Sequence, residues 1–528
     1  MREYFDTVSK FLENGKINES FIGIAQINST AGDFENNAKK IIEFIKFSHE
    51  IELKTLFFSP YALSGFGLCD VKKRYPSVES DCFKWLDRIA ELSKNMTVCV
   101  GVFDKFAVIK NNKIELVDFD FVLDGISITI DKNSEVKYPK IYLNSVGATD
   151  YKSFDGASKV YNVDGKLIAQ AKSFEEQLII FSFNKNNGEI CSAIEKKYKN
   201  EFSLDYEDEM EYTYRALIQG IKDYFSKCGL KRAVLGLSGG LDSTVSAVLL
   251  VDALGKENVL GVSMPSKLTS VESKSDAKKL AENLGITFIE KTIKPMFETT
   301  NECLQSIFTE VEKAWNCRYK ESFTADNIQA RSRAMYLWGI ANEFASCIPI
   351  ATSDKSELYM GYATINGDMS GGFATIADVT KTKLFALARW LNKNRKEKNV
   401  IPESIILKKP GAELAIDPRT GKTLNAEDAL MPYEFLDEII WRIENKHESY
   451  AKLLEDEFLY EKKNSISKEQ KIEWLDKFYR RMSTSIYKSS IMPPYVVLDD
   501  NTINKNVYCH PITSGRINYK TEDWNVII

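Results

Sequence analysis

Residues 238–243 read Ser238-Gly239-Gly240-Leu241-Asp242-Ser243, and this turn decides the fold of the chain around it. It follows the apolar run Ala233-Val-Leu-Gly-Leu237 and precedes residues 244–250, whose apolar side chains have helical spacing. That order predicts a strand, a tight turn and a helix. Two adjacent glycines let backbone N–H groups approach an anion, and the helix start adds the positive end of its dipole. The sequence therefore predicts a phosphate site at this turn.

Asp242 is unexpected in a phosphate-binding turn, because its carboxylate would repel the phosphates. A hard divalent cation with oxygen ligands, such as Mg²⁺, removes that conflict when it lies between the two. The turn lacks the lysine of G-x-x-x-x-G-K-[ST] and the spacing of G-x-G-x-x-G. It resembles the S-G-G-x-D-S loop of enzymes that cleave ATP between the α and β phosphates and release pyrophosphate. An ordinary glycine turn capped by serine and aspartate is the alternative.

Length and composition limit the class of protein. The 528 residues predict two or three domains, and a hydrophobic fraction of 44% supplies large cores. The net charge of −5 argues against a nucleic-acid or membrane surface, which needs a basic face. Nine cysteines without a C-x-x-C pair indicate reduced thiols and a cytoplasmic location. We expect a soluble protein whose partners are small molecules.

Residues 1–185 resemble the nitrilase superfamily. A strand begins near Phe21, and a Gly-Asp turn, an amphipathic helix over residues 35–51 and the strand Thr55-Leu-Phe-Phe58 follow it. The later run Phe154-Asp-Gly-Ala-Ser158 matches the end of the same fold. The resemblance implies an α/β/β domain in which a cysteine, a glutamate and a lysine hydrolyse glutamine, the cysteine as nucleophile and the glutamate as base.

The sequence lacks that catalytic triad. The motif F-P-E-L-x-L-[ST]-G aligns with Phe58-Ser-Pro-Tyr-Ala-Leu-Ser-Gly65 and places Pro60, which cannot take up a proton, at the position of the base. Neither the lysine motif nor the cysteine motif occurs between Ser64 and Asn144. We interpret three cysteines of this region as small buried hydrophobes, namely Cys69, Cys82 and Cys99. We expect a shortened nitrilase-like domain without glutaminase activity, followed by a linker over residues 186–204.

Residues 205–528 form the second predicted domain. From residue 233 to residue 293, predicted strands alternate with predicted helices. This alternation predicts a doubly wound parallel sheet with ligands at the carboxyl ends of its strands. Six motifs in order resemble the NAD synthetases, and the whole chain resembles their glutamine-dependent form, which implies a nucleotide α-hydrolase (adenine nucleotide) fold. The motifs cover residues 237–245, 261–266, 326–333, 351–358 with 361–373, 378–381 and 387–390.

The resemblance implies roles for single residues, with ATP and Mg²⁺ as cofactors. Asp242 and Glu357 would hold the metal, and with Lys381 they are the expected catalytic residues. The expected ATP contacts are Gly236, Leu237, Ser238, Gly239, Gly240, Leu241, Asp242, Ser243, Thr352 and Lys381. The expected contacts of the second substrate, deamido-NAD, are Asn327, Arg331, Glu357, Asp368 and Lys488.

The expected reaction is the amidation of deamido-NAD to NAD through an acyl-adenylate, with AMP and pyrophosphate as the other products. Ammonia would come from solution or from a separate glutaminase. Some positions depart from the family pattern: T-G-N becomes Thr352-Ser353-Asp354, a hydroxyl residue becomes Gly411, and two arginines become Ser489 and Ser490. These changes leave open a ligase for a different carboxylic acid, and a catalytically silent nucleotide-binding scaffold is a third hypothesis. Since family members dimerise through the synthetase domain, we expect a homodimer or a larger homo-oligomer.

Overall fold

The computed structural model describes residues 20–135, 137, 139–149, 152–184, 189–192, 208–317, 323–411 and 425–498. It divides into two compact units, Met1–Asp223 and Tyr224–Ile528, and the division falls inside helix α5 (Glu209–Lys227). Strand β14 (Glu189–Ser192) lies within the residues expected to form a linker, and it pairs with β13. None of the helices described in these ranges has the length and apolar character needed to cross a bilayer.

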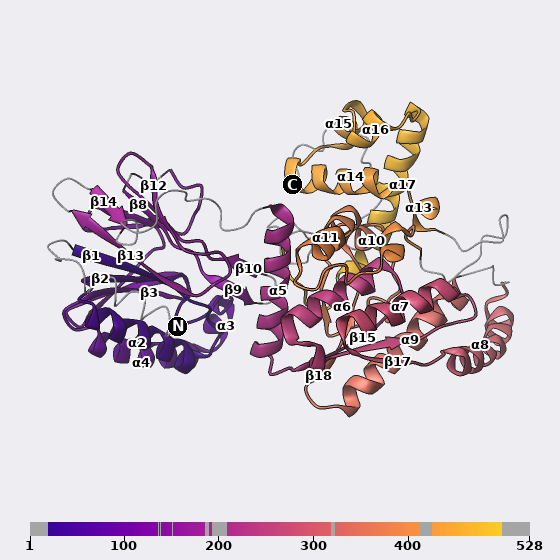
Figure 1. The fold of residues 1–528 in the computed structure, drawn as a ribbon, viewed down its shortest axis with the longest axis horizontal. Helices are drawn as coiled ribbons and strands as arrows, with labels where there is room; N and C mark the ends of the chain where they lie inside the picture. Colours follow the sequence, from indigo (N-terminus) through magenta and orange to yellow (C-terminus); the bar gives the residue numbers. More distant parts are fainter. Residues whose placement is uncertain are drawn as a thin grey trace. The chain divides into compact units, whose positions relative to one another are not determined.

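The first unit has three main layers, one of helices and two of β-sheet, and it also contains a small two-stranded sheet of β9 (Val146–Thr149) and β10 (Lys152–Asp155) (Figure 1). Helices α2 (Phe34–Glu50) and α4 (Pro76–Leu92) cover one face of the larger sheet, and the smaller sheet packs on its other face. The order of strands in the larger sheet is β14, β13 (Gln177–Asn184), β1 (Ser20–Gln26), β2 (Thr55–Phe58), β3 (Thr97–Val102), β4 (Lys105–Lys110) and β5 (Lys113–Val117). The smaller sheet contains β12 (Leu167–Gln170), β11 (Lys159–Tyr161), β8 (Lys140–Tyr142), β7 (Ile126–Thr129) and β6 (Phe121–Leu123). This arrangement confirms the expected α/β/β layers.

The central strands of the larger sheet are apolar at nearly every position because both of their faces are buried. Ile24, Phe57 and Cys99 are neighbours in register across β1, β2 and β3, and their side chains belong to the core between the two sheets. Ala25 and Phe58, one residue further along, belong to the core under the helices. The register therefore places the Cys99 thiol inside the sandwich.

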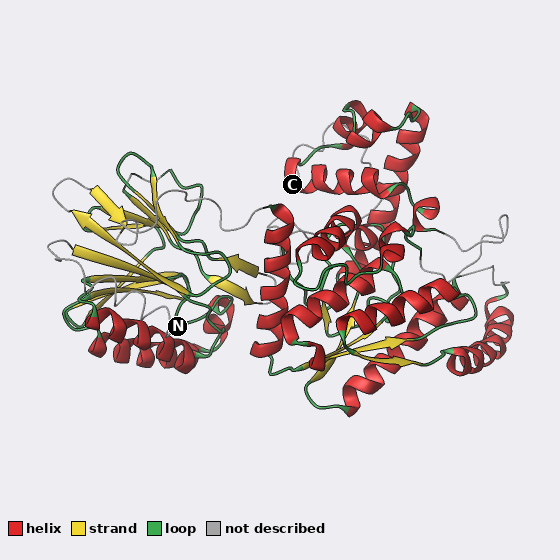
Figure 2. Ribbon diagram, in the orientation of Figure 1, coloured by secondary structure: helices red, strands yellow, loops and turns green. Residues whose placement is uncertain are grey.

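The second unit contains a parallel sheet flanked by helices (Figure 2). Its order is β17 (Thr287–Glu290), β16 (Val259–Ser263), β15 (Arg232–Gly236), β18 (Cys347–Ala351) and β19 (Phe373–Ala374). Helices that pack on it include α6 (Leu241–Leu254), α7 (Val271–Leu284) and α9 (Thr324–Glu343). The chain runs outward from β15 to β17 and then returns to place β18 on the other side of β15. The strand order thus reverses between β15 and β18, which is where open α/β sheets bind their ligands.

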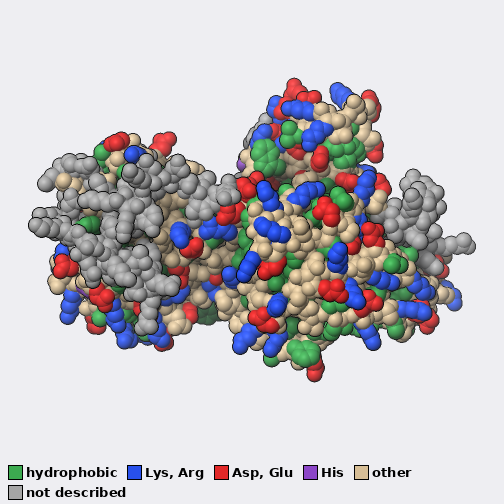
Figure 3. All heavy atoms as spheres, in the orientation of Figure 1, with side chains coloured by type: hydrophobic (Ala, Val, Ile, Leu, Met, Phe, Trp, Pro, Cys, Tyr) green, Lys and Arg blue, Asp and Glu red, His purple; other side chains and the backbone are tan. Residues whose placement is uncertain are grey.

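The rest of the second unit is largely helical, with a core of its own around Phe435, Phe458 and Phe478. The helices used below are α10 (Lys355–Tyr359), α11 (Lys381–Asn394), α14 (Tyr433–Lys446) and α17 (Lys468–Ser489). The others are α3 (Cys69–Arg74) in the first unit and, in the second, α8 (Lys294–Trp315), α12 (Glu403–Leu407), α13 (Ala426–Ala429), α15 (Tyr450–Glu455) and α16 (Leu459–Lys463). On the face shown in Figure 3, acidic and basic side chains of the described residues are interspersed.

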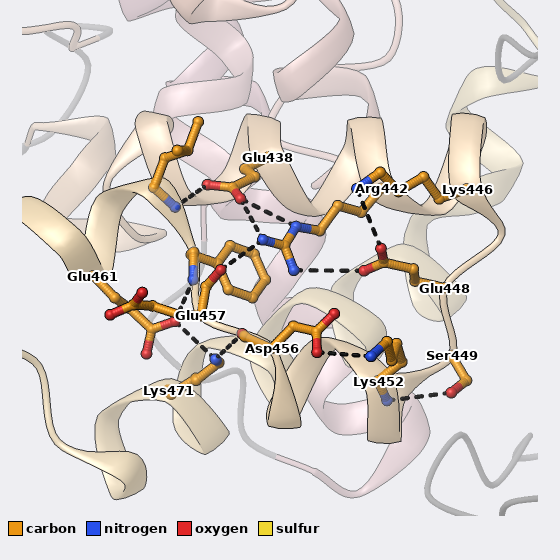
Figure 4. A network of polar contacts seen from close by, with 12 residues as sticks. Glu438, Arg442, Lys446, Glu448, Ser449, Lys452, Asp456, Glu457, Glu461 and Lys471 are labelled. Atoms are coloured by element: carbon orange, nitrogen blue, oxygen red, sulfur yellow. Dashed lines mark hydrogen bonds and ion pairs between the residues drawn. The ribbon is translucent and has the colours of Figure 1, made fainter.

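A polar network fixes α14 to the segments that follow it (Figure 4). Arg442 donates two hydrogen bonds to Glu438 Oε1 and one to the carbonyl of Glu457, and it pairs with Glu448. Lys471 of α17 pairs with Glu461 of α16 at 2.8 Å. These contacts are charge-assisted and partly buried, so they hold α14 in a defined orientation.

Candidate active site

The glycine-rich turn lies at the carboxyl end of β15, and α6 begins at Leu241 rather than at residue 244, so Asp242 and Ser243 lie in its first turn. Gly239 has a φ of +78°, and a Cβ there would lie 2.1 Å from the carbonyl oxygen of Ser273. Only glycine fits that close approach to α7. The N-cap residue Gly240 has no side chain that could cap the first N–H groups of α6. The first turn of α6 is therefore suited to an external anion.

Two serine hydroxyls close the turn. Ser243 Oγ accepts a hydrogen bond from the backbone N–H of Ser238, and Ser238 Oγ accepts one from the N–H of Gly240. The two hydroxyl oxygens lie 3.0 Å apart. Thr352, the other expected ATP contact, directly follows β18. The turn and Thr352 thus occupy the two strand ends at which the sheet order reverses.

Lys381, the first residue of α11, is 1% exposed and is surrounded by carboxylates. Its Nζ lies 2.6 Å from Asp242 Oδ1, 2.6 Å from Asp354 Oδ2 and 3.1 Å from Glu357 Oε1. It also lies 5.5 Å from the centre of the Tyr433 ring. The structure therefore brings together the three residues expected to be catalytic, although they are separated by up to 139 positions.

The charges of this cluster do not balance, because one ammonium faces three carboxylates. Burial raises the pKa of Glu357 well above its usual range, and the neighbouring carboxylates add to the rise. Burial likewise raises the pKa of Asp354 to about 6, although Lys381 opposes the rise. Burial alone would lower the pKa of Lys381, but the three carboxylates outweigh it and the pKa is raised well above its usual range. The cluster has room for more positive charge than Lys381 supplies.

Oxygen donors of Asp242, Asp354 and Glu357 all lie within 4.8 Å of one another. Carboxylate oxygens are the ligands that Mg²⁺ prefers, and the excess negative charge suits a divalent cation. The donor set therefore fits the metal that the sequence led us to expect. Asp354 adds a third carboxylate to the two expected ligands.

The expected contacts of the second substrate converge on the loop formed by residues 361–368, which follows α10. From α9, Asn327 Oδ1 accepts a hydrogen bond from Thr364 Oγ1, and Arg331 Nε donates to the carbonyl of Ile365. Lys488 Nζ, on α17, donates to the carbonyls of Gly361 and Ala363 at 2.8 and 2.7 Å. All these expected residues therefore contact one loop, whose first carbonyl lies four residues beyond Glu357.

Asp368, the last residue of this loop, links the loop to Ser353 through hydrogen bonds of its carboxylate. Its Oδ1 accepts from the N–H of Thr364 at 2.7 Å, and its Oδ2 accepts from Ser353 Oγ at 3.1 Å. Burial raises the pKa of Asp368, whereas burial lowers that of Lys488. Because Ser353 follows Thr352, Asp368 connects the loop to the end of β18.

Three residues near the site were not among those expected from the sequence. In the sequence, Asp354 stood out only because it replaces the asparagine of T-G-N. In the structure, its Oδ2 lies 2.6 Å from Lys381 Nζ, which places its carboxylate in the cluster. Arg481, on α17, donates to the carbonyl of Met360 and lies over the ring of Tyr362. Asp437, on α14, contacts the start of α11. The last two act through backbone groups, so no motif marks them.

In the first unit, Pro60 stands at the position that the nitrilase resemblance assigns to the catalytic base. Pro60 lies two residues beyond β2, and its carbonyl accepts a hydrogen bond from Ser145 Oγ. The next residue, Tyr61, has its ring 5.1 Å from Phe66 and 5.3 Å from Phe119. Phe66 in turn lies 5.3 Å from Phe154. Aromatic packing, without an acidic side chain in the base position, follows the end of β2.

The three cysteines of this unit lie in different places. Cys82 and Cys99 are fully buried, and Cys69 at the start of α3 is half-buried. Burial raises the pKa of all three thiols, that of Cys82 to about 12. A thiol with a raised pKa is protonated at neutral pH and is a poor nucleophile.

Comparisons with known proteins agree on one family. A family model described as NAD synthase matches residues 213–478. The chain is 40% identical over 316 residues to the glutamine-dependent NAD(+) synthetase of Synechocystis sp., and the match covers 60% of this chain but only 52% of that relative. It is 31% identical to the enzyme of the same name from Thermotoga maritima, covering 79% of this chain and 88% of that relative. The crystal structure of a glutamine-dependent NAD(+) synthetase from Cytophaga hutchinsonii has a TM-score of 0.71 at 19% identity, covering 94% of this chain and 98% of that one, which shows a shared fold.

Proposed function

Because this chain belongs to the NAD synthase family, we propose that it converts deamido-NAD to NAD by ATP-dependent amidation through an acyl-adenylate. The observation that carries this proposal is the cluster of Lys381 with Asp242, Asp354 and Glu357 beside the turn 238–243. It lies where the strand order reverses, next to a helix start suited to phosphate.

The reaction has two steps. A carboxylate oxygen of the nicotinate group attacks the α-phosphorus of ATP, and the bond to the bridging oxygen breaks, so pyrophosphate leaves. Ammonia then attacks the acyl carbon, AMP leaves and the extra proton is lost. Neither step needs a protein nucleophile, so the chain contributes positioning and stabilisation of charge.

Each group of the site has a part in the first step. The N–H groups at the start of α6 and the ammonium of Lys381 bind the triphosphate. Mg²⁺ held by Asp242, Glu357 and Asp354 would neutralise charge on the departing pyrophosphate. The loop 361–368, with Asn327, Arg331, Asp368 and Lys488 around it, positions the dinucleotide.

We propose that the ammonia comes from solution or from a separate glutaminase. The support for this is Pro60 at the place of the base and the raised pKa of the thiols of Cys69, Cys82 and Cys99. A homo-oligomer and a cytoplasmic location stay predictions from the sequence.

An end-point assay by mass spectrometry tests the reaction. The full chain is incubated with ATP, Mg²⁺ and deamido-NAD, with either ammonium or glutamine as nitrogen donor. We expect NAD, AMP and pyrophosphate with ammonium, and no amide above background with glutamine. Asp242→Asn should abolish the product, whereas Asp252→Asn, on the same helix but paired with Arg395, serves as the matched control.

Other outcomes contradict separate parts of the proposal. Efficient use of glutamine would overturn the statement on the ammonia source. Pyrophosphate release with another carboxylic acid, in clear preference to deamido-NAD, would replace the substrate. If no acid causes pyrophosphate release, the chain is a nucleotide-binding scaffold.

A further inference from the structure

The start of α11 is held by a residue from another helix. Among the described residues, the N-cap residue Thr380 makes no side-chain cap hydrogen bond. Instead, Asp437 Oδ2 accepts a hydrogen bond from the backbone N–H of Thr382 at 2.8 Å. The N–H of Lys381 donates to Ser356 Oγ at 2.9 Å, and Ser356 Oγ donates to Asp437 Oδ1 at 2.5 Å. A carboxylate 55 positions away thus satisfies the first turn of α11.

We propose that Asp437 is a positioning residue for Lys381, and that it sets where the ammonium meets the triphosphate. This inference rests on the proposed function. The backbone of Lys381 has to be fixed for its Nζ to lie within 3.1 Å of three different carboxylates. Asp437, which is 6% exposed, fixes that backbone directly through Thr382 and indirectly through Ser356.

The same carboxylate fixes the opposite side of the cluster. Ser356 precedes Glu357 in α10, a helix of only five residues that cannot hold its own orientation. Asp354 caps this helix by accepting a hydrogen bond from the N–H of Glu357. Because Asp437 also accepts a hydrogen bond from Ser356, this one side chain on α14 fixes the positions of both Lys381 and α10, the helix that carries Glu357.

The neighbouring residue on α14 offers a matched control. Glu438 is also a carboxylate that accepts a backbone hydrogen bond, from the N–H of Leu459 at 2.8 Å, and it pairs with Arg442 (Figure 4). These partners belong to the helical network and are not members of the Lys381 cluster. Loss of Glu438 therefore reports the effect of destabilising α14 alone.

The test compares Asp437→Ala, Asp437→Asn and Glu438→Gln in the full chain. Asp437→Ala should raise the KM for ATP and the Kd for ATP with Mg²⁺ by about tenfold or more, because small displacements of a catalytic group have large effects. Asp437→Asn keeps one acceptor for Thr382 and should recover most of the loss. Glu438→Gln should leave both constants within about twofold. Thermal unfolding of each variant shows whether it is folded.

A double-mutant cycle with Lys381→Met separates positioning from stability. If Asp437 acts through Lys381, adding Asp437→Ala to Lys381→Met changes the Kd for ATP by less than about threefold. Equal effects in both backgrounds, or an equal loss in Glu438→Gln, would overturn the inference. The cycle measures nucleotide binding by calorimetry, so it tests the role of Asp437 even if the wild-type protein makes no NAD. A lack of NAD formation would reject the proposed function and would leave the role of Asp437 to be decided by the cycle.

Discussion

The two units differ in how many charged side chains they bury and in how closely these side chains cluster. Among the described residues of the first unit, the buried charged side chains are Lys140 and Asp223. In the second unit, Lys381 and Lys355 are both buried, and each faces more than one carboxylate. Burial of charge is unfavourable unless each group has partners, and buried clusters of titratable groups are therefore candidates for functional sites. The difference agrees with the proposal that the amidation takes place in the second unit.

The second buried cluster lies directly beside the first along α10. Lys355 Nζ lies 2.6 Å from Glu444 and 3.0 Å from Asp378, and Tyr359 donates to Glu444. Asp378 also accepts a hydrogen bond from the N–H of Leu498. This cluster joins α10 to α14 and to the last described segment. The ion pairs of Lys355 therefore hold α10, the short helix that carries Glu357, in position among many charged side chains.

Beyond the Asp242→Asn variant already described, the largest effect is expected from Lys381→Met. Loss of the ammonium removes the cation beside the triphosphate and leaves three carboxylates unopposed, so turnover with ammonium should fall by about 10²–10³-fold. The measurement is the initial rate of pyrophosphate release. Lys393→Met, on the exposed side of the same helix, is the control and should keep its rate. A similar loss in both variants would remove Lys381 from the site.

A smaller effect is expected from Asp354→Asn. Asparagine can still cap α10 through the N–H of Glu357, but one of the three carboxylates is lost. The Mg²⁺ concentration for half-maximal rate should therefore rise by about tenfold, with little change in the rate at saturating metal. Titration of the rate with Mg²⁺ measures this. An unchanged metal requirement would show that Asp354 is not a ligand.

The third prediction concerns stability and pH. Burial raises the pKa of Glu444 to about 7, although Lys355 and Tyr359 favour its charged form. Since this pKa is above that of the unfolded chain, the stabilising contribution is complete below about pH 4.5 and is lost as pH rises through about 7. Between pH 5 and pH 8, wild-type protein should lose about 2 kcal/mol of unfolding free energy relative to Glu444→Gln.

Urea unfolding followed by tryptophan fluorescence checks this, because six of the seven tryptophans belong to the second unit. Glu434→Gln is the control, since Glu434 is an exposed carboxylate of the same helix and its loss should leave the pH dependence unchanged. If wild type and Glu444→Gln respond to pH in the same way, Glu444 is charged throughout the range.

The smallest effect is expected in the first unit. A reactive glutamine analogue, 6-diazo-5-oxo-L-norleucine, should form no adduct with Cys69, Cys82 or Cys99, because burial raises the pKa of all three thiols and keeps them protonated at neutral pH. The rate with ammonium should also be unchanged. Peptide mass spectrometry after treatment is the measurement. An adduct on any of the three cysteines would mean that this unit retains a nucleophile.

The fold could be predicted well where local pattern and topology agree. Apolar runs on both sides of the turn predicted β15 and α6, and the alternation of strands and helices predicted the parallel sheet, which the structure confirms. The helix starts at Leu241 because Asp242 and Ser243 can adopt helical geometry in a first turn. The strand expected over residues 287–293 ends at Glu290, shortly before α8 begins at Lys294 with Pro295 in its first turn.

The candidate site could be predicted only in part. Ordered motifs indicated Asp242, Glu357 and Lys381, and comparison with known proteins confirmed the family. The departures from the family pattern at Gly411, Ser489 and Ser490 lie within the described residues. Asp437 and Arg481 act on backbone groups of distant segments, so nothing in their local sequence distinguishes them from other charged residues on amphipathic helices.

The sequence by itself determined the strand, the glycine-rich turn and the helix around residues 238–243, and the proline at position 60, because each depends on residue type and local spacing. Only the tertiary structure decided that Asp354 joins the carboxylates around Lys381 and that Asp437 holds the start of α11. Such contacts depend on how separate helices pack, and the interaction of two charges depends on their distance and burial, which spacing along the chain does not fix.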